Sequence, residues 1–167
     1  PKGVMICHLS LAAKVHWQVH DLEITPQDAN VCHPSFSFDA SIDDLFVPLA
    51  GGASVHILSE DIRQNMKELY DYLVAQNITG GSFSTQFGLE MANQFELPLR
   101  YMIMGGEKMV PVKKRNVQII NGYGPTEFTV CSSYHKVDQA RDTENIPIGR
   151  PVPNTCLLYT SPSPRDS

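Results

Sequence analysis

The sequence predicts an α/β fold, with helices layered on a largely parallel β-sheet. Short apolar and β-branched runs alternate with segments whose apolar residues recur at helical spacing, which is the pattern of consecutive βαβ units. Several of these segments end at glycine pairs, such as Gly51-Gly52 and Gly105-Gly106. With 167 residues, 42% of them hydrophobic and 19% charged, the chain is long enough for one domain with its own core.

Four helices are predicted, two of them, residues 9–20 and 61–76, from the spacing of apolar residues. Residues 9–20 place apolar side chains over much of a helix surface, as in a buried helix. A second helix begins just after Phe38, with acidic residues in the first turn, where the helix macrodipole stabilises negative charge, and ends at Gly51. Residues 61–76 and 85–94 form the other two.

The strands are predicted from apolar and β-branched runs bounded by glycine, proline or asparagine. They cover residues 53–58, 78–83, 101–104, 117–120 and 129–137. Residues 31–38 suit a strand or an extended loop, because apolar residues alternate there with small or polar ones. Residues 146–151 form a rigid extended passage, because proline fixes φ and moves its predecessor out of the helical region.

The composition argues against several classes of protein. The net charge of -5, with one basic cluster at Lys113-Lys114-Arg115, argues against nucleic-acid binding. We expect no membrane partner, because the apolar runs are too short to cross a bilayer. The four cysteines form no Cys-x-x-Cys pair and suit a reducing, cytoplasmic compartment. His16 and His20 have the spacing of a zinc pair, but no third ligand follows nearby, so we expect ordinary helix histidines.

Both ends of the chain are expected to be cut. Residues 1–3 lead directly into an apolar stretch, as in a truncated loop. Residues 156–166 resemble the translation of a transposon-type sequencing adapter, so we expect residues 156–167 to be a non-native, disordered tail. The alternative is a genuine proline-rich linker that begins near Pro151 and is equally disordered.

The turn at residues 121–127 is the best candidate for a ligand site. It reads Asn-Gly-Tyr-Gly-Pro-Thr-Glu and follows the predicted strand 117–120. Ligands of open α/β sheets bind beyond the carboxyl ends of the strands. An aromatic ring, a hydroxyl and a carboxylate delivered to that place indicate binding, and the alternative is a plain surface turn.

Five motifs, in order, resemble the adenylation domains of nonribosomal peptide synthetases, which belong to the adenylate-forming enzyme superfamily. They are Pro1-Lys2-Gly3, Phe38-Asp39-Ala40-Ser41, Gly105-Gly106-Glu107, the turn at 121–127, and Ile148-Gly149-Arg150-Pro151. The resemblance covers residues 1–155. It implies an internal fragment of the large N-terminal domain of that fold, truncated at both ends and expected to be inactive alone.

The resemblance implies an ATP-dependent ligase. In that family an amino acid is activated as aminoacyl-AMP with ATP and Mg2+. It is then transferred to the phosphopantetheine thiol of a carrier-protein domain, within a synthetase that also holds condensation domains. Two alternatives stay open. One is a stand-alone acyl or D-alanyl ligase of the same superfamily. The other is a non-catalytic nucleotide-binding module that uses Tyr123 only for stacking.

The resemblance also implies roles at the nucleotide. Tyr123 matches the adenine-stacking aromatic residue and Asn121 the residue that contacts the base. Thr126 and Glu127 match the catalytic pair at the α-phosphate and the magnesium ion, with Glu127 as the metal ligand. Lys2 matches the end of the phosphate loop. The implied nucleotide-binding set is completed by Gly106, Gly122 and Gly124.

The implied substrate pocket consists of Asp39, Ala40, Asp43, Ser82, Ile103, Gly105, Gly122, Val130 and Cys131. Asp39 matches the position that holds the α-ammonium group of an amino acid; a helix-capping aspartate is the alternative. Asp43 adds a second charge, and a buried carboxylate without a partner costs roughly 3–5 kcal/mol. We therefore expect a cationic substrate, unless Asp43 points to solvent and says nothing about the substrate. The pocket set resembles those of lysine-activating adenylation domains, with Asp in place of the more usual Glu, which implies lysine or, for the shorter acid, another diamino acid such as ornithine.

Overall fold

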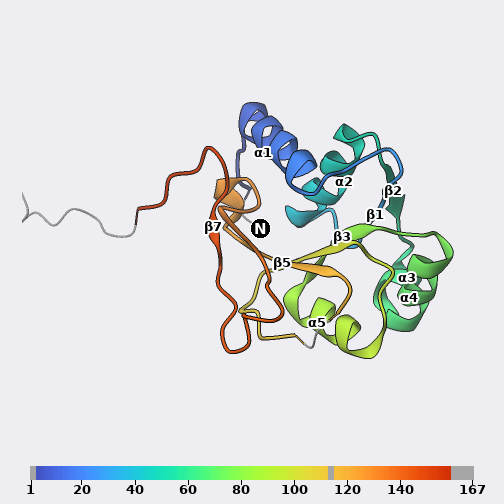
Figure 1. Ribbon diagram of the computed structural model, residues 1–167. Helices are drawn as coiled ribbons and strands as arrows, with labels where there is room; N and C mark the ends of the chain where they lie inside the picture. Colours follow the sequence, from blue (N-terminus) through green and yellow to red (C-terminus); the bar gives the residue numbers. More distant parts are fainter. Residues whose placement is uncertain (1–2, 113–114, 159–167) are drawn as a thin grey trace, which may run out of the picture.

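The computed structural model describes residues 3–112 and 115–158. It confirms the predicted α/β class, with helices on both faces of a seven-stranded sheet (Figure 1). The strands are β1 (Ala29–Cys32), β2 (Ser54–Ile57), β3 (Gly80–Ser84), β4 (Tyr101–Gly105), β5 (Gln118–Tyr123), β6 (Ser133–Lys136) and β7 (Arg150–Pro151). The helices are α1 (His8–Asp21), α2 (Ala40–Ala50), α3 (Glu60–Gln64), α4 (Met66–Ala75), α5 (Thr85–Gln94) and the 3-10 helix η1 (Thr126–Phe128).

The sheet is mostly parallel. Its strand order is β2-β1-β3-β4-β5-β6-β7. The strands from β2 to β5 in this order pair in parallel, whereas β6 and β7 are antiparallel to their neighbours. The carboxyl ends of β3, β4 and β5 therefore meet at one edge, where open α/β sheets bind ligands.

Two hydrophobic clusters attach helices to opposite faces of the sheet. One cluster packs α4 and α5 against β4 and includes Leu69 and Met102, both fully buried. The other packs α1 and α2 against the same strand and includes Val15 and Tyr101. Tyr101 and Met102 thus serve different clusters, as the two-residue repeat of a strand requires. Figure 1 shows α1 and α2 above the sheet and α5 below it.

The predicted helix 61–76 is wrong in one respect, because it divides into α3 and α4 at Asn65. Asn65 has an extended backbone, with φ -104° and ψ 107°, and its side chain accepts hydrogen bonds from the backbone N–H groups of Lys67 and Glu68. Asparagine competes with the helix for such groups and is among the preferred N-cap residues. Asn65 is therefore the N-cap of α4, and the helical spacing of apolar residues continues across it, so the spacing gave no sign of the break.

Asn65→Ala is expected to lower the free energy of unfolding by about 1 kcal/mol, because two N–H groups of α4 lose their acceptor. Urea denaturation measures this change. Gln76→Ala is the matched control, since Gln76 is exposed at the other end of α4. Equal stability of Asn65→Ala and the control would contradict the capping role.

Two predicted strands are shorter than expected. The segment 31–38 is a strand only as far as Cys32 and then turns toward α2. The segment 129–137 becomes a strand only at Ser133, because Thr129 and Val130 have positive φ angles of 58° and 73°. β-Branched residues rarely adopt this backbone conformation, and such strain concentrates at functional sites.

Other predictions concern the surface. His16 and His20 are exposed on α1, with ring centroids 4.6 Å apart. Within residues 3–112 and 115–158, no group of three or more metal-binding side chains occurs. In the same part of the chain, no helix is long and apolar enough to span a membrane. The expected tail lies outside the described residues from position 159 onward.

Candidate functional site

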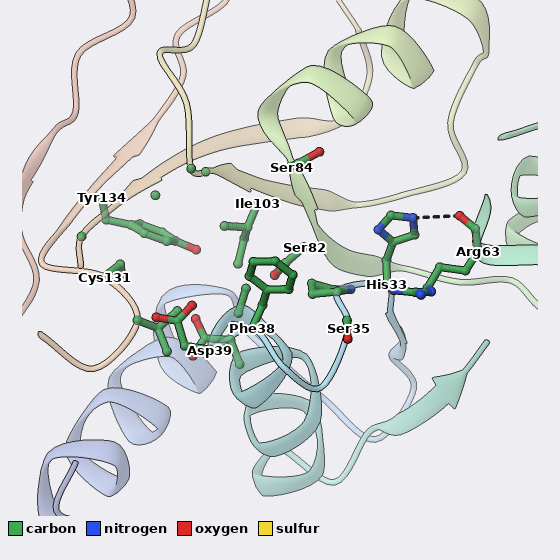
Figure 2. Close-up of a pocket in the computed structure, with 18 residues that line it drawn as sticks. His33, Ser35, Phe38, Asp39, Arg63, Ser82, Ser84, Ile103, Cys131 and Tyr134 are labelled. Atoms are coloured by element: carbon green, nitrogen blue, oxygen red, sulfur yellow. Dashed lines mark hydrogen bonds between the residues drawn. The ribbon is translucent and has the colours of Figure 1, made fainter. Parts of the chain in front are cut away.

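A cavity of about 390 Å³ lies at the carboxyl ends of β3, β4 and β5 (Figure 2). We call it the strand-end cavity. The strands contribute Ser82, Ile103 and Gly122 to its wall, and the start of α2 contributes Asp39 and Asp43. In Figure 2, Asp39 lies across the cavity from Tyr134 and Ile103. The place is the one predicted for a ligand of an open α/β sheet.

All nine residues of the implied substrate pocket line this cavity. They are Asp39, Ala40, Asp43, Ser82, Ile103, Gly105, Gly122, Val130 and Cys131. They come from five separate segments, and the fold brings them to one surface. That they bind a substrate stays a prediction.

Asp39 presents a carboxylate that has no partner among the residues that the structure describes. It occupies the N-cap position of α2, but its backbone is helical and its side chain makes no capping hydrogen bond. The side chain is half-buried at the cavity wall. Among the described residues it forms no ion pair either. The carboxylate is therefore free to accept a cationic group of a ligand.

Asp43 differs from Asp39 because the protein supplies its counter-ion. The Nζ atom of Lys14, from α1, lies 2.5 Å from each carboxylate oxygen of Asp43. The two side chains are only 4% and 7% exposed. Burial raises the pKa of Asp43, and the neighbouring Lys14 ammonium opposes this effect.

The ion pair removes the premise on which the prediction of a cationic substrate rested. That prediction assumed that Asp43 is buried without a partner, and this premise is wrong. The alternative, that Asp43 points to solvent, is wrong as well. Sequence reasoning missed Lys14 because it lies 29 positions before Asp43, in a helix predicted only from its apolar residues.

Asp44, next to this pair, fixes α2 to the sheet. Its carboxylate accepts hydrogen bonds from the backbone N–H of Ser82 at 3.1 Å and from the Ser82 hydroxyl at 2.7 Å. Burial raises the pKa of Asp44 to about 8, although the hydrogen bonds from Ser82 oppose the shift. Since Ser82 lines the strand-end cavity, Asp44 positions one wall of the site.

The raised pKa of Asp44 predicts a pH-dependent stability. An unfolded aspartate titrates near pH ~4, so the folded state holds a proton that the unfolded state releases. The stabilisation is complete below that pH and is lost as the pH rises through about 8. We expect urea denaturation from pH 5 to 9 to show wild type losing stability relative to Asp44→Asn as the pH rises. Parallel curves for the two proteins would contradict the assignment.

A second cavity, of about 320 Å³, lies beside the first and is called the tyrosine cavity. Five of the seven implied nucleotide-binding residues line it: Gly106, Asn121, Gly122, Tyr123 and Gly124. Tyr123 is 55% exposed, so it is accessible to a ligand that could stack on it. Asn121 is buried, and its amide nitrogen donates to the carbonyl oxygen of Pro147 at 2.8 Å.

The residues that the linings of the two cavities share are all glycines. Gly106, Gly122 and Gly124 line both. At Gly124, a Cβ atom would lie 2.5 Å from the backbone nitrogen of Ser132 and 2.6 Å from the Cα atom of Cys131. At Gly105, a Cβ atom would lie 2.7 Å from the carbonyl oxygen of Gly122. Because these three shared residues have no side chains, they leave room for one ligand to extend across this glycine seam.

Thr126 and Glu127 belong to η1, away from the tyrosine cavity. Glu127 lines a third cavity, of about 510 Å³, between α1, η1 and residues 152–155. We call it the helix cavity. The structure thus does not bring Glu127 together with Tyr123 in one cavity. Lys2 lies outside the described residues.

The carboxylate of Glu127 fits a magnesium ligand. It is exposed and, within the described part of the chain, pairs with no cationic side chain. Mg2+ at nucleotide sites takes one or two carboxylates and completes its shell with phosphate oxygens and water. A single free carboxylate therefore suits this ion, and Glu127 would hold it.

The strand-end cavity also contains residues that the sequence did not indicate. His33 stacks on Phe87 with ring centroids 4.6 Å apart, and burial lowers its pKa. Tyr134 lines the cavity, and its hydroxyl is buried without a hydrogen-bond partner among the described residues. Neither residue follows a local sequence signal, since the sheet brings them to the cavity from β1 and β6.

Comparison with known proteins identifies the family. The family model described as AMP-binding enzyme matches residues 1–158. Bacitracin synthase 1 of Bacillus licheniformis is 35% identical over 154 residues, which cover 92% of this chain and 3% of that protein. Tyrocidine synthase 2 of Brevibacillus parabrevis is 35% identical over 161 residues, which cover 94% of this chain and 4% of that protein. The chain thus spans a few per cent of the length of these relatives.

A solved structure agrees with the observed fold. The nonribosomal peptide synthetase FmoA3, in its α-methyl-L-serine-AMP-bound form, superposes with a TM-score of 0.82 at 24% identity. The match covers 92% of this chain and 19% of that one. The resemblance to adenylation domains of nonribosomal peptide synthetases is thereby confirmed. The chain belongs to the AMP-binding enzyme family.

Proposed function

We propose that this chain is the part of an amino-acid-activating domain that holds the amino acid and the adenine of ATP. The observation that carries the proposal is the carboxylate of Asp39. It has no partner among the described residues and faces a cavity that the glycine seam joins to the tyrosine cavity. A carboxylate that is partly withdrawn from water and unpaired favours a cationic ligand, as the α-ammonium group of an amino acid is.

The proposed reaction joins the two cavities. The carboxylate of the amino acid attacks the α-phosphorus of ATP, the bond to the β-phosphate oxygen breaks, and aminoacyl-AMP and pyrophosphate form. Asp39 holds the α-ammonium group in the strand-end cavity. Tyr123 stacks on adenine in the tyrosine cavity, and Asn121 contacts the base. With both ends fixed, the reacting carboxylate and phosphate meet at the glycine seam, which lowers the entropic part of the barrier.

Two further residues act on the phosphates in this proposal. The hydroxyl of Thr126 donates to the α-phosphate, and the carboxylate of Glu127 holds Mg2+. When bound, this ion stabilises the negative charge that develops on the transferred phosphate. Glu127 lines the helix cavity next to α1, and there it would hold the ion.

The wider assembly is also part of the proposal. Residues 1–155 form part of an adenylation domain in this proposal, and residues 156–167 form a tail outside it, of which the family model still matches residues 156–158. The relatives are peptide synthases that are far longer than this chain. We infer that the activated amino acid passes to the phosphopantetheine thiol of a carrier-protein domain and that condensation domains lie in the same protein.

ATP–pyrophosphate exchange tests the proposal. The complete domain that contains this chain is incubated with ATP, Mg2+, labelled pyrophosphate and one amino acid at a time. We expect exchange with at least one amino acid and none without it. ATP binding without exchange for any amino acid would overturn the proposal in favour of a non-catalytic nucleotide-binding module.

A further inference from the structure

We propose that Lys14 is a specificity-determining residue that restricts the strand-end cavity to amino acids with uncharged side chains. It neutralises Asp43 from outside the space that the substrate would occupy. The inference rests on the proposed function, since it names the class of amino acid that the cavity takes.

The ammonium group of Lys14 has no capacity left for a ligand. A lysine ammonium has three N–H donors. Its Nζ atom lies 2.5 Å from both oxygens of Asp43 and 2.9 Å from the Oε1 atom of Gln18. With its side chain 4% exposed, Lys14 acts as a fixed internal counter-ion.

The position of Lys14 separates it from the substrate. Asp43 lines the strand-end cavity, whereas Lys14 lines the helix cavity on the other side. Cys131 lines both and lies between them. Lys14 therefore changes the charge of the pocket wall without forming that wall itself.

The charges around the cavity then exclude ionic side chains. Besides Asp39 and the Lys14–Asp43 pair, the charged group at the wall is Arg63, which is already paired with Glu60 at 2.5 Å. Asp39 is needed for the α-ammonium group. A cationic side chain would find Asp43 occupied, and an anionic one would face a carboxylate. Burying either without a counter-ion is strongly unfavourable.

Substitution of either partner should invert this selectivity. Lys14→Met keeps the length of the side chain and removes its charge, so that Asp43 needs a cation from the substrate. Asp43→Asn leaves Lys14 without its anion, so that an acidic substrate is favoured. The double variant K14M/D43N removes both charges. The matched control is Lys67→Met, because Lys67 is an exposed lysine paired with Asp71 at 2.5 Å.

The test is ATP–pyrophosphate exchange by the complete domain with neutral, basic and acidic amino acids. We expect wild type and Lys67→Met to prefer a neutral amino acid. Lys14→Met should raise kcat/KM for lysine or ornithine, relative to that neutral amino acid, by about a hundredfold. Asp43→Asn should raise the same ratio for aspartate or glutamate, and the double variant should return to the neutral preference.

Three results would overturn the inference. The first is a wild-type preference for a charged amino acid. The second is an equal loss with every amino acid in Lys14→Met, which indicates a structural role only. The third is an unchanged substrate preference in Asp43→Asn. This variant still tests the pair if Lys14→Met does not fold, as judged by circular dichroism. Absence of exchange with any amino acid in wild type would instead overturn the proposed function, and the inference with it.

Discussion

Asp39→Asn should abolish most amino-acid activation. We expect kcat/KM for the preferred amino acid in ATP–pyrophosphate exchange to fall by about 100- to 1000-fold, the effect of removing one partner from a desolvated charge pair. The wild-type carboxylate has no partner among the described residues, so its substitution breaks no ion pair within this part of the protein. The variant should therefore be as stable as the wild type.

Nucleotide binding separates this prediction from a general loss of function. The tyrosine cavity does not include Asp39, so the Kd for ATP without amino acid should change less than about twofold, within the spread expected of a distant, independent site. Asp71→Asn, at an exposed aspartate of α4, is the control for removal of a surface charge. Full exchange activity in Asp39→Asn would show that the ammonium group binds elsewhere.

Gly124→Ala should reduce both amino-acid activation and ATP binding. The added methyl group would meet backbone atoms of Cys131 and Ser132 at 2.6 and 2.5 Å. Backbone atoms cannot rotate away, so the turn or the start of β6 must shift. We expect about 1–3 kcal/mol of lost stability, as in overpacked sites. Exchange activity and ATP binding should fall together, because Gly124 lines both cavities.

Gly122→Ala is the matched control for this prediction. Gly122 also lines both cavities, but its added methyl group would lie 3.4 Å from a side-chain carbon of Ile103, an ordinary contact distance. The fold should survive this substitution, so the comparison concerns stability. Equal losses of stability in the two variants would show that the close approach of the backbone at Gly124 is not the cause.

The architecture could be predicted because buried, apolar residues recur along the sequence at the spacings of helices and strands. The predicted helices match α1, α2 and α5 within a few positions, and the β-branched run before Asn121 matches β5. The prediction was wrong where a single residue interrupts the regular backbone of a helix or strand. Asn65 divides one predicted helix, and the left-handed residues Thr129 and Val130 delay β6.

Part of the candidate site could be predicted from sequence motifs, but the contacts between helices in that site could not. Motif spacing located the nine residues that line the strand-end cavity. It did not indicate Lys14, because the contact with Asp43 depends on how α1 packs against α2. A charge that looks unpaired in a sequence can thus have its partner on another helix, and here that partner removes the reason to expect a cationic substrate.

The central claim is that one ligand lies across the glycine seam, with its ammonium group at Asp39 and its adenine at Tyr123. A crystal structure of the complete domain with a non-hydrolysable aminoacyl-adenylate analogue tests it directly. The account predicts the amine nitrogen within about 3 Å of an Asp39 oxygen, as in a charge-assisted hydrogen bond, with the adenine ring stacked on Tyr123. An analogue whose amine pairs with Asp43, or whose adenine lies in the helix cavity, would contradict it.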